Sequence, residues 1–182
     1  MPSLKGRLLV ALPVLVDPNF DRTVVLVLEH GDEGALGVVL NRPGDLRLDE
    51  PLPSWADVAA PPAVVFVGGP VGAGAAIGLG LVPGAPSERD GFVQVAGDLG
   101  TVDLGSAPLD VGVAEVRVFA GYSGWGPGQL EDEILAGAWL VVDAGPDDAL
   151  SPDPSTLWRR VLRRQPGRTA WLANLPTDPS VN

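Results

Sequence analysis

The sequence contains no cysteine, and it has only one histidine, His30, and one methionine. Without cysteine, the chain has no disulfide framework, no thiolate nucleophile and no zinc site of the usual thiolate kind. Carboxylates are then the main remaining metal ligands, but Asp147, Asp148 and Asp153 do not have the spacing of a calcium loop. We therefore expect neither a bound metal nor a cofactor.

Basic residues are also scarce, since 12 Lys and Arg stand against 23 Asp and Glu. The formal net charge is −11, and the sequence pI is near 4.3. A negative charge of this size opposes non-specific binding to nucleic acid and to anionic lipid. It is compatible with a basic partner, although solubility alone is a simpler explanation of an acidic surface.

Long apolar runs are absent as well. The N-terminal run Leu8–Val16 follows Lys5 and Arg7 and superficially resembles a signal peptide. However, Pro13 interrupts this run, and no small residues of a cleavage site follow it. The run is also far shorter than the roughly 20 residues that span a bilayer. We interpret it as a buried strand and expect a cytoplasmic protein without a membrane partner.

The composition that remains is that of one folded domain. The chain has 182 residues, of which 46% are hydrophobic, so it can bury a sizeable core. Its 24 glycines and 19 prolines are expected to separate many short strands. We see no linker, low-complexity segment or internal repeat. The prediction is a single domain over residues 1–182, with flexible ends at about 1–6 and 177–182.

Short apolar runs predict a series of strands. Thr23–Leu28 is almost continuously apolar and β-branched, which is typical of a central strand covered on both faces. A turn separates it from Ala35–Leu40, so we expect these two runs to form a hairpin. The other expected strands are Leu8–Ala11, Ala63–Val67, Ala76–Leu81, Phe92–Val95, Val113–Ala120 and Ala138–Val142.

Two segments have the pattern of amphipathic helices. In Ser155–Arg164, four apolar side chains share one face and four arginines share the other. In Gln129–Gly137, acidic residues fall in the first turn, where the helix dipole favours negative charge. We also expect a helical turn around Trp55–Val58 and an edge strand at Thr169–Leu172.

A glycine-rich aromatic segment stands between the strand that ends at Ala120 and the helix that begins at Gln129. It holds Tyr122 and Trp125 among four glycines and Pro127. Glycine adopts backbone angles that are closed to other residues, and proline lacks an amide donor. We therefore expect this segment to be an irregular loop.

Four motifs occur in order along the chain. They are Asp17-Pro-Asn-Phe-Asp-Arg-Thr23, Gly37-Val-Val-Leu-Asn-Arg-Pro43, Gly68-Gly-Pro-Val71 and Gly121-Tyr-Ser-Gly-Trp-Gly-Pro-Gly-Gln-Leu-Glu131. Together they span most of the chain and resemble the signature segments of the bacterial YqgE/AlgH family. The resemblance implies an α+β fold: a single domain with a bifurcated mixed β-sheet, partly closed into a small barrel and flanked by helices. It implies no particular chemistry, because the family's biochemical function is not established and only one branch is described as a transcriptional regulator of polysaccharide synthesis.

The candidate binding residues come from strand boundaries and from this resemblance. Arg22, Asn41 and Arg42 occur where loops gather around a rigid sheet, which is where binding residues tend to lie. The resemblance marks the same three positions. An alternative is that the two arginines pair with Asp17, Asp21 or Glu131 and only fix the geometry of the loops. The resemblance also marks Tyr122, Ser123, Trp125 and Gln129.

A serine hydrolase is a weaker interpretation of the same segment. Ser123 follows a strand, as the serine of a nucleophile elbow does, but Trp125 takes the place of the second glycine of that motif. His30 is the only possible histidine base, and it lies upstream of the serine, whereas it follows the serine in this class of hydrolase. We expect no catalytic residues and no enzymatic activity.

Nucleic-acid binding is the second alternative. Five of the twelve basic residues lie between Arg159 and Arg168. However, the sequence has no helix-turn-helix pattern, and its acidic remainder weakens the attraction to DNA. We therefore expect a cytoplasmic, non-enzymatic binding or regulatory protein. It would act through a protein or small-molecule partner by way of the Tyr122–Gln129 segment.

Overall fold

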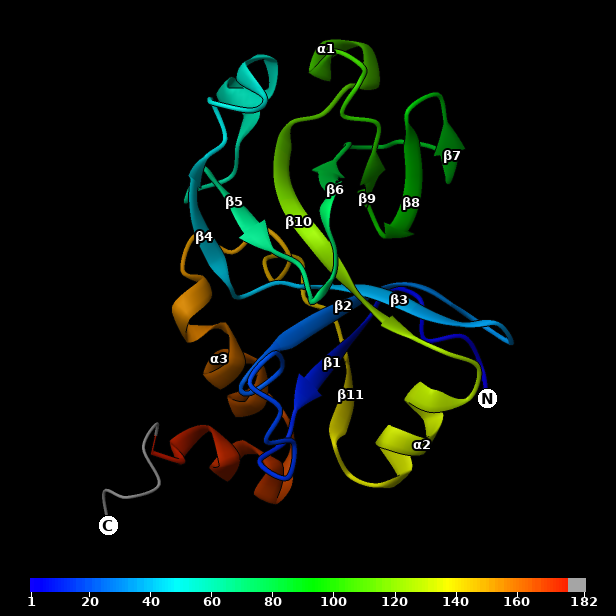
Figure 1. Cartoon of the computed structure of the whole chain (residues 1–182), viewed down its shortest axis with the longest axis vertical. Helices are drawn as coiled ribbons and strands as arrows, with labels where there is room; N and C mark the ends of the chain where they lie inside the picture. The colour runs from blue at the N-terminus through cyan, green and yellow to red at the C-terminus, as the bar shows by residue number, and fades with distance from the viewer. Residues whose placement is uncertain (177–182) are drawn as a thin grey trace.

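The sheet is organised around one long strand, β10 (Glu115–Trp125), in the computed structural model, which describes residues 1–176 (Figure 1). The other strands are β1 (Arg7–Ala11), β2 (Val24–Gly31), β3 (Gly34–Val39), β4 (Pro43–Arg47), β5 (Val64–Val67), β6 (Val71–Leu81), β7 (Glu88–Arg89), β8 (Phe92–Ala96), β9 (Leu99–Val102) and β11 (Trp139–Asp143). The helices are α1 (Pro108–Val111), α2 (Gln129–Leu135) and α3 (Leu157–Arg163), together with the 3-10 helices η1 (Pro53–Val58), η2 (Pro154–Thr156) and η3 (Gly167–Asn174).

Strand β10 joins two branches of this sheet. Its end pairs with β3, and that branch continues through β2 and β1 to β11. Its earlier part pairs with β6, followed by β9, β8 and β7, while β5 pairs with the middle of β10 in parallel. The sheet is therefore mixed and mostly antiparallel, with few helices, which confirms the expected α+β class. Among the described residues the paired strands do not close on themselves, so the partial closure into a small barrel is not confirmed.

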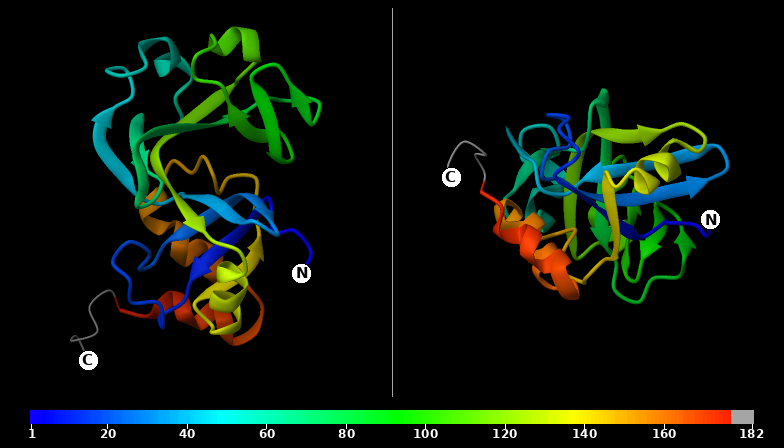
Figure 2. Two further views of the ribbon diagram at one scale, coloured as in Figure 1. Left: turned by 45° about the vertical axis from the view of Figure 1, so that its right-hand side comes forward. Right: turned by 90° about the horizontal axis from the view of Figure 1, so that it is seen from below.

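The branch formed by β3, β2, β1 and β11, which is the lower one in Figure 1, is covered on both faces. Leu8 and Leu26 point toward α3 and η3, whereas Leu9 and Val25 point toward α2. Figures 1 and 2 show α3 and η3 side by side against one face and α2 against the other. This arrangement explains why β2 is continuously apolar, and it confirms the prediction of a central strand. The predicted hairpin of β2 and β3 is confirmed as well.

The other branch, formed by β6, β9, β8 and β7 and upper in Figure 1, has a separate core. Trp55 of η1 is fully buried there, and its indole N–H donates to the carbonyl oxygen of Leu104 at 3.1 Å. Val116 and Val118 of β10 contribute to the same core from the upper face of the strand. Arg117 and Phe119 lie on the opposite face, so β10 separates the upper core from the lower one.

The prediction of an irregular loop after Ala120 is wrong, because β10 continues to Trp125. Alternate residues of this stretch are buried, which is the pattern of a strand, but the glycines obscured it in the sequence. A bulge falls between Ala120 and Tyr122, and Gly121 there has φ +72°. A Cβ atom at Gly121 would lie only 2.7 Å from the carbonyl oxygen of Gly69. The glycine thus allows the connection between β5 and β6 to approach β10 closely, rather than ending the strand.

The two main helices are confirmed near their expected positions, as α2 and as η2 continuing into α3. The helical turn at Trp55 is confirmed as η1. The edge strand predicted at Thr169–Leu172 is wrong, because this segment belongs to η3. Leu172 and Ala173 pack into the core beside α3, and such a short apolar run does not distinguish a strand from a helical segment.

The ends of the chain were expected to be flexible. Leu4 is nevertheless buried, and its backbone N–H donates to His30 Nδ1 at 3.0 Å, so residues near the N-terminus pack against the sheet. The predicted C-terminal tail, 177–182, lies outside the described residues. Over residues 1–176, no helix is both long enough and apolar enough to cross a membrane.

Candidate functional site

The loop Asp17–Thr23, which connects β1 to β2, is folded tightly onto itself. The Asp17 carboxylate accepts the N–H of Asn19 at 2.9 Å, and the Asp17 carbonyl accepts the N–H groups of Phe20 and Asp21. At the other end, the Thr23 hydroxyl donates to the carbonyl of Phe20 at 2.7 Å. Asp and Thr side chains often close turns in this way on neighbouring backbone. The first motif of the sequence therefore encodes a defined loop.

Asn41 and Arg42 brace this loop from the end of β3. The Asn41 amide donates to the carbonyl of Arg22 and accepts the N–H of Val24, both at 2.9 Å. The Arg42 guanidinium donates to the carbonyls of Asn19 and Asp21, at 2.6 and 3.1 Å. The alternative, in which Arg42 pairs with a carboxylate, is not seen within the described residues, because its partners are backbone carbonyls. Both side chains fix loop geometry.

Arg22 is held in an unusual conformation at the end of the loop. Its φ is +54°, and it is the only residue other than glycine with a positive φ in the described part of the chain. Its guanidinium lies over the ring of Trp158, 4.8 Å from the ring centre, and donates to the carbonyls of Leu175 and Pro176. A left-handed conformation costs about 1–2 kcal/mol in a residue with a Cβ atom. Strain of this kind tends to occur at functional sites, where surrounding contacts maintain it.

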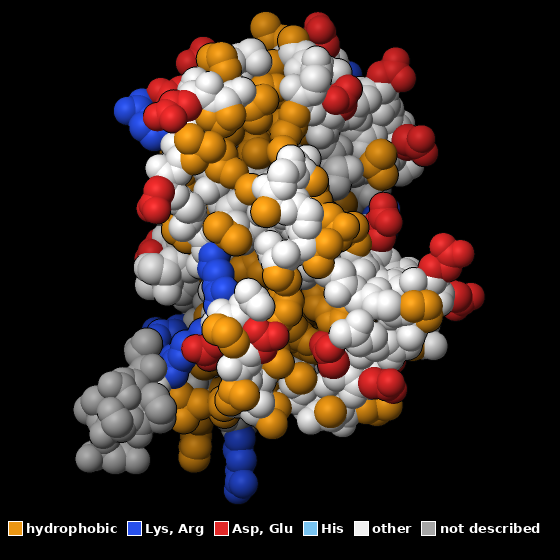
Figure 3. All heavy atoms as spheres, in the orientation of Figure 1, with side chains coloured by type: hydrophobic (Ala, Val, Ile, Leu, Met, Phe, Trp, Pro, Cys, Tyr) orange, Lys and Arg blue, Asp and Glu red, His pale blue; other side chains and the backbone are white. Residues whose placement is uncertain are grey.

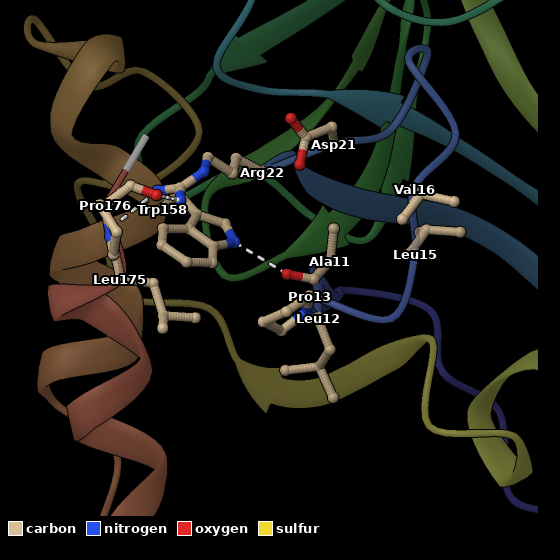
Figure 4. Close-up of a pocket in the computed structure, with 10 residues that line it drawn as sticks. All are labelled: Ala11, Leu12, Pro13, Leu15, Val16, Asp21, Arg22, Trp158, Leu175 and Pro176. Atoms are coloured by element: carbon tan, nitrogen blue, oxygen red, sulfur yellow. Dashed lines mark hydrogen bonds between the residues drawn. The ribbon is translucent and has the colours of Figure 1, made fainter. Parts of the chain in front are cut away.

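A cavity of about 480 Å³ lies beside this loop (Figure 4). Trp158 and Leu175 form one wall, Leu15 and Val16 form the other, and the backbone around Leu12 forms the floor. The Asp21 carboxylate lies above the floor, between these walls, and has no hydrogen bond or ion pair with any described residue. The cavity is thus a largely apolar space that holds the free Asp21 carboxylate, with the Arg22 guanidinium along its Trp158 wall.

The side chains of the Tyr122–Gln129 segment that were expected to bind a partner make contacts within the fold. Trp125 is only 7% exposed, stacks on Phe20 at 6.3 Å between ring centres, and donates its indole N–H to Glu133 at 2.9 Å. Gln129 accepts the N–H of Gly126 at 3.0 Å and donates to Glu133, which organises the start of α2. Tyr122 is half-buried and packs against the lower core. Trp125 contacts the Asp17–Thr23 loop through Phe20.

Ser123 and His30 do not form a catalytic pair. Ser123 is fully buried, and its hydroxyl donates to the carbonyl of Gly68 at 3.2 Å. His30 Nδ1 accepts the N–H of Leu4, so Nε2 carries the proton and donates to Glu131 at 2.7 Å. The pKa of Glu131 is lowered, first by a backbone hydrogen bond and then by this bond from His30. Both ring nitrogens of the only histidine are therefore engaged away from the serine.

The arginines of the C-terminal segment are mostly tied to the protein. Arg159 donates to the carbonyls of Ala173 and Leu175, and Arg160 donates to the hydroxyls of Ser151 and Thr156. Arg164 forms an ion pair with Asp148, whose hydrogen bond raises the pKa of the guanidinium. Arg163 and Arg168 remain exposed. The predicted basic patch is therefore smaller than its sequence indicates.

Two residues that the structure makes prominent were not singled out from the sequence, one in the cavity wall and one buried in the core. Trp158 was assigned only to a core-facing helix side, yet its ring also forms a cavity wall. Arg117 is buried and donates to the carbonyls of Pro61, Ala149 and Ser151, at 2.6, 3.2 and 3.0 Å. Burial lowers its pKa to about 10. The sequence did offer a signal for Arg117, because it is the one basic residue within the apolar run that forms β10.

These features define a small mixed α+β protein with a braced loop and an adjacent cavity of ligand size. Within residues 1–176, no three carboxylate or imidazole side chains gather as a metal site requires. The chain belongs to the AlgH-like family (DUF179), whose family model matches residues 8–170. The resemblance seen in the four motifs is therefore confirmed.

Relatives and solved structures agree with this assignment. A UPF0301 protein of Streptomyces coelicolor is 55% identical over 185 residues, which cover 99% of this chain and 96% of the relative. A crystal structure of a Corynebacterium diphtheriae protein has a TM-score of 0.89 at 32% identity and covers 96% of this chain and 93% of its own. The solution structure of AlgH from Pseudomonas aeruginosa has a TM-score of 0.68 at 29% identity, with coverages of 97% and 96%. The names of these proteins state no biochemical activity.

Proposed function

We propose that this protein is a non-enzymatic, cytoplasmic binding protein with a regulatory role, which acts through a protein partner at the cavity beside the Asp17–Thr23 loop. The observation that carries the proposal is the free Asp21 carboxylate held above apolar walls by a braced loop. Asn41 and Arg42 hold that loop, and Arg22 is kept in a strained conformation next to the cavity. Rigid presentation of this kind lowers the cost of ordering a binding site when a partner arrives.

The lining of the cavity indicates which side chain of a partner would enter. A lysine or arginine has an apolar stem that suits the Trp158 and Leu15 walls and a charged end that suits Asp21. The net charge of −11 would also attract a basic partner. Val16, which lines the cavity, is 85% exposed, and Val14, two residues earlier in the chain, is 65% exposed. Exposed apolar side chains beside a cavity are typical of a surface that a protein partner covers.

This proposal changes the role of the Tyr122–Gln129 segment. Trp125 would act indirectly, because its stacking on Phe20 positions the loop rather than contacting the partner. The absence of a contact between Ser123 and His30 supports a non-enzymatic function. A regulator that contacts nucleic acid has less support, since Arg159, Arg160 and Arg164 are engaged within the protein.

The test is affinity purification from the native cell with matched variants. Val16→Asp and Asp21→Lys alter the rim and the charge of the cavity, while Leu109→Asp alters a residue that is 93% exposed on the distant helix α1. We expect a specific partner to be retained by the Leu109→Asp variant and lost by the other two, with all three melting temperatures preserved. A partner list that is identical for all variants would contradict the proposal.

A further inference from the structure

A second hollow of about 480 Å³ lies in the upper branch of the sheet, across β10. Its lining includes Val65, Val118 and Ala120 from the sheet, together with Leu46, Leu52 and Leu104. Residues 73–76 contribute to the lining as well, and 73–75 belong to an irregular stretch of β6, since Val71 pairs with Tyr122 and Ala76 already pairs with Ala120. Five separate segments therefore line one open, largely apolar groove, whose volume is within the range of small-molecule sites.

The interior of the groove offers almost no polar chemistry. Asp103 is its only charged lining residue, and its carboxylate already accepts the N–H of Gly105 at 2.9 Å and the hydroxyl of Ser106 at 3.0 Å. A polar group placed deep in this groove would lose its hydrogen bonds to water without finding new ones. The part of a ligand that enters must therefore be apolar.

The stretch of chain that supplies almost all of the groove lining is strongly acidic. Residues 43–118 contain ten Asp and Glu against three Lys and Arg. Of the three, Arg117 is buried on the opposite face of β10, and Arg47 is paired with Asp49 at 2.6 Å. Figure 3 shows hydrophobic side chains in the upper half of this face with acidic side chains around them. A field of this sign repels anions and concentrates cations at the opening.

We propose that this groove binds an amphiphilic organic cation, with its apolar chain in the groove and its positive group at the acidic rim. The proposal is independent of the partner site beside the Asp17–Thr23 loop, since the two cavities share no residue. The volume of the groove, which is that of a small-molecule site, favours a small molecule over a peptide.

The first test compares three ligands with the same eight-carbon apolar chain: octylammonium, 1-octanol and nonanoate. Binding is followed at neutral pH through backbone amide chemical shifts. We expect octylammonium to bind at least about tenfold more tightly than nonanoate, with octanol between them, because the apolar chain is the same and the charge of the head group differs. The preference should shrink as salt is added. Equal affinities, or tighter binding of nonanoate, would overturn the proposal.

The second test places the ligand. Ala75→Trp fills the groove from the exposed bulge, whereas Ala136→Trp adds the same side chain at an exposed position after α2. Octylammonium binding should be lost only in the Ala75→Trp variant, and Val16→Asp should leave it unchanged. Asp103→Asn keeps the oxygen that accepts from Gly105 but removes the charge, so octylammonium should bind about two- to fivefold more weakly. If only a basic amphipathic peptide binds here, a protein partner replaces the small cation and the proposal is wrong.

Discussion

Trp125 and Trp139 donate their indole N–H groups to the same carboxylate oxygen, Oε2 of Glu133, at 2.9 and 2.8 Å. The two rings also meet edge to face, with their centres 6.0 Å apart. One carboxylate on α2 thereby connects the end of β10 to β11, and through Trp125 it supports Phe20 in the Asp17–Thr23 loop.

Replacing Glu133 with alanine should therefore leave two largely buried indole N–H groups without an acceptor. Each such group costs about 1–3 kcal/mol, so we expect Glu133→Ala to lower the free energy of unfolding by about 2–4 kcal/mol in urea titrations. Asp132→Ala, on the exposed side of the same helix, is the control and should cost less than about 1 kcal/mol. Equal effects of the two substitutions would mean that the shared acceptor contributes nothing specific.

Arg117 should be important for stability although it has no carboxylate partner among the described residues. Its guanidinium lies 4.3 Å from the centre of the Phe66 ring and satisfies three backbone carbonyls. Arg117→Met would leave those carbonyls without a donor, and we expect a loss of about 2–4 kcal/mol. Arg117→Lys should lose less, because an ammonium still donates but cannot stack or form a planar fork.

The exposed Arg163 provides the control for this series, since Arg163→Met should change stability by less than about 0.5 kcal/mol. An unchanged urea midpoint for Arg117→Met would show that the variant gains as much stability by no longer burying a charge as it loses with the hydrogen bonds.

The left-handed conformation of Arg22 predicts an unusual order of substitutions. Both Arg22→Gly and Arg22→Ala remove the guanidinium that lies over Trp158. Only alanine retains the cost of a Cβ atom at φ +54°, so the glycine variant should be more stable by about 1 kcal/mol. Elsewhere in a folded chain, glycine is usually the less stable of the two. Thermal unfolding of the two variants measures the difference, and a more stable alanine variant would show that the loop relaxes out of this conformation.

Local patterns predicted much of this fold. The continuous apolar run of β2 required cover on both faces, and the two-faced pattern of α3 required a core on one side only. The course of β10 beyond Ala120 was missed because glycines that allow close strand approach look the same in sequence as glycines that form turns.

The candidate site was predictable only in part, for a physical reason. Arg22, Asn41 and Arg42 were placed together correctly because they flank neighbouring strands. The cavity, however, also needs Trp158 and Leu175, which lie more than a hundred residues further along the chain. Tertiary packing brings these residues to the loop, and no local pattern encodes that contact. Trp125 was identified from its motif, but its burial reversed the role expected for it.

The bond between His30 and Glu131 predicts a dependence of stability on pH. Backbone and His30 hydrogen bonds lower the pKa of Glu131 below its ordinary value of 4.5 in the folded protein. The unfolded chain therefore binds this proton more readily, so the stabilisation is present above about pH 4.5 and is lost as the pH falls through the folded pKa.

The Glu131→Gln variant has no carboxylate at this position, so it cannot show this loss. In urea titrations between pH 5 and pH 3, the midpoint of the wild type should fall more than that of Glu131→Gln. The variant Glu33→Gln, which removes a carboxylate from the turn between β2 and β3, should follow the wild type. Parallel curves for the wild type and Glu131→Gln would show that this carboxylate is not held by the folded structure.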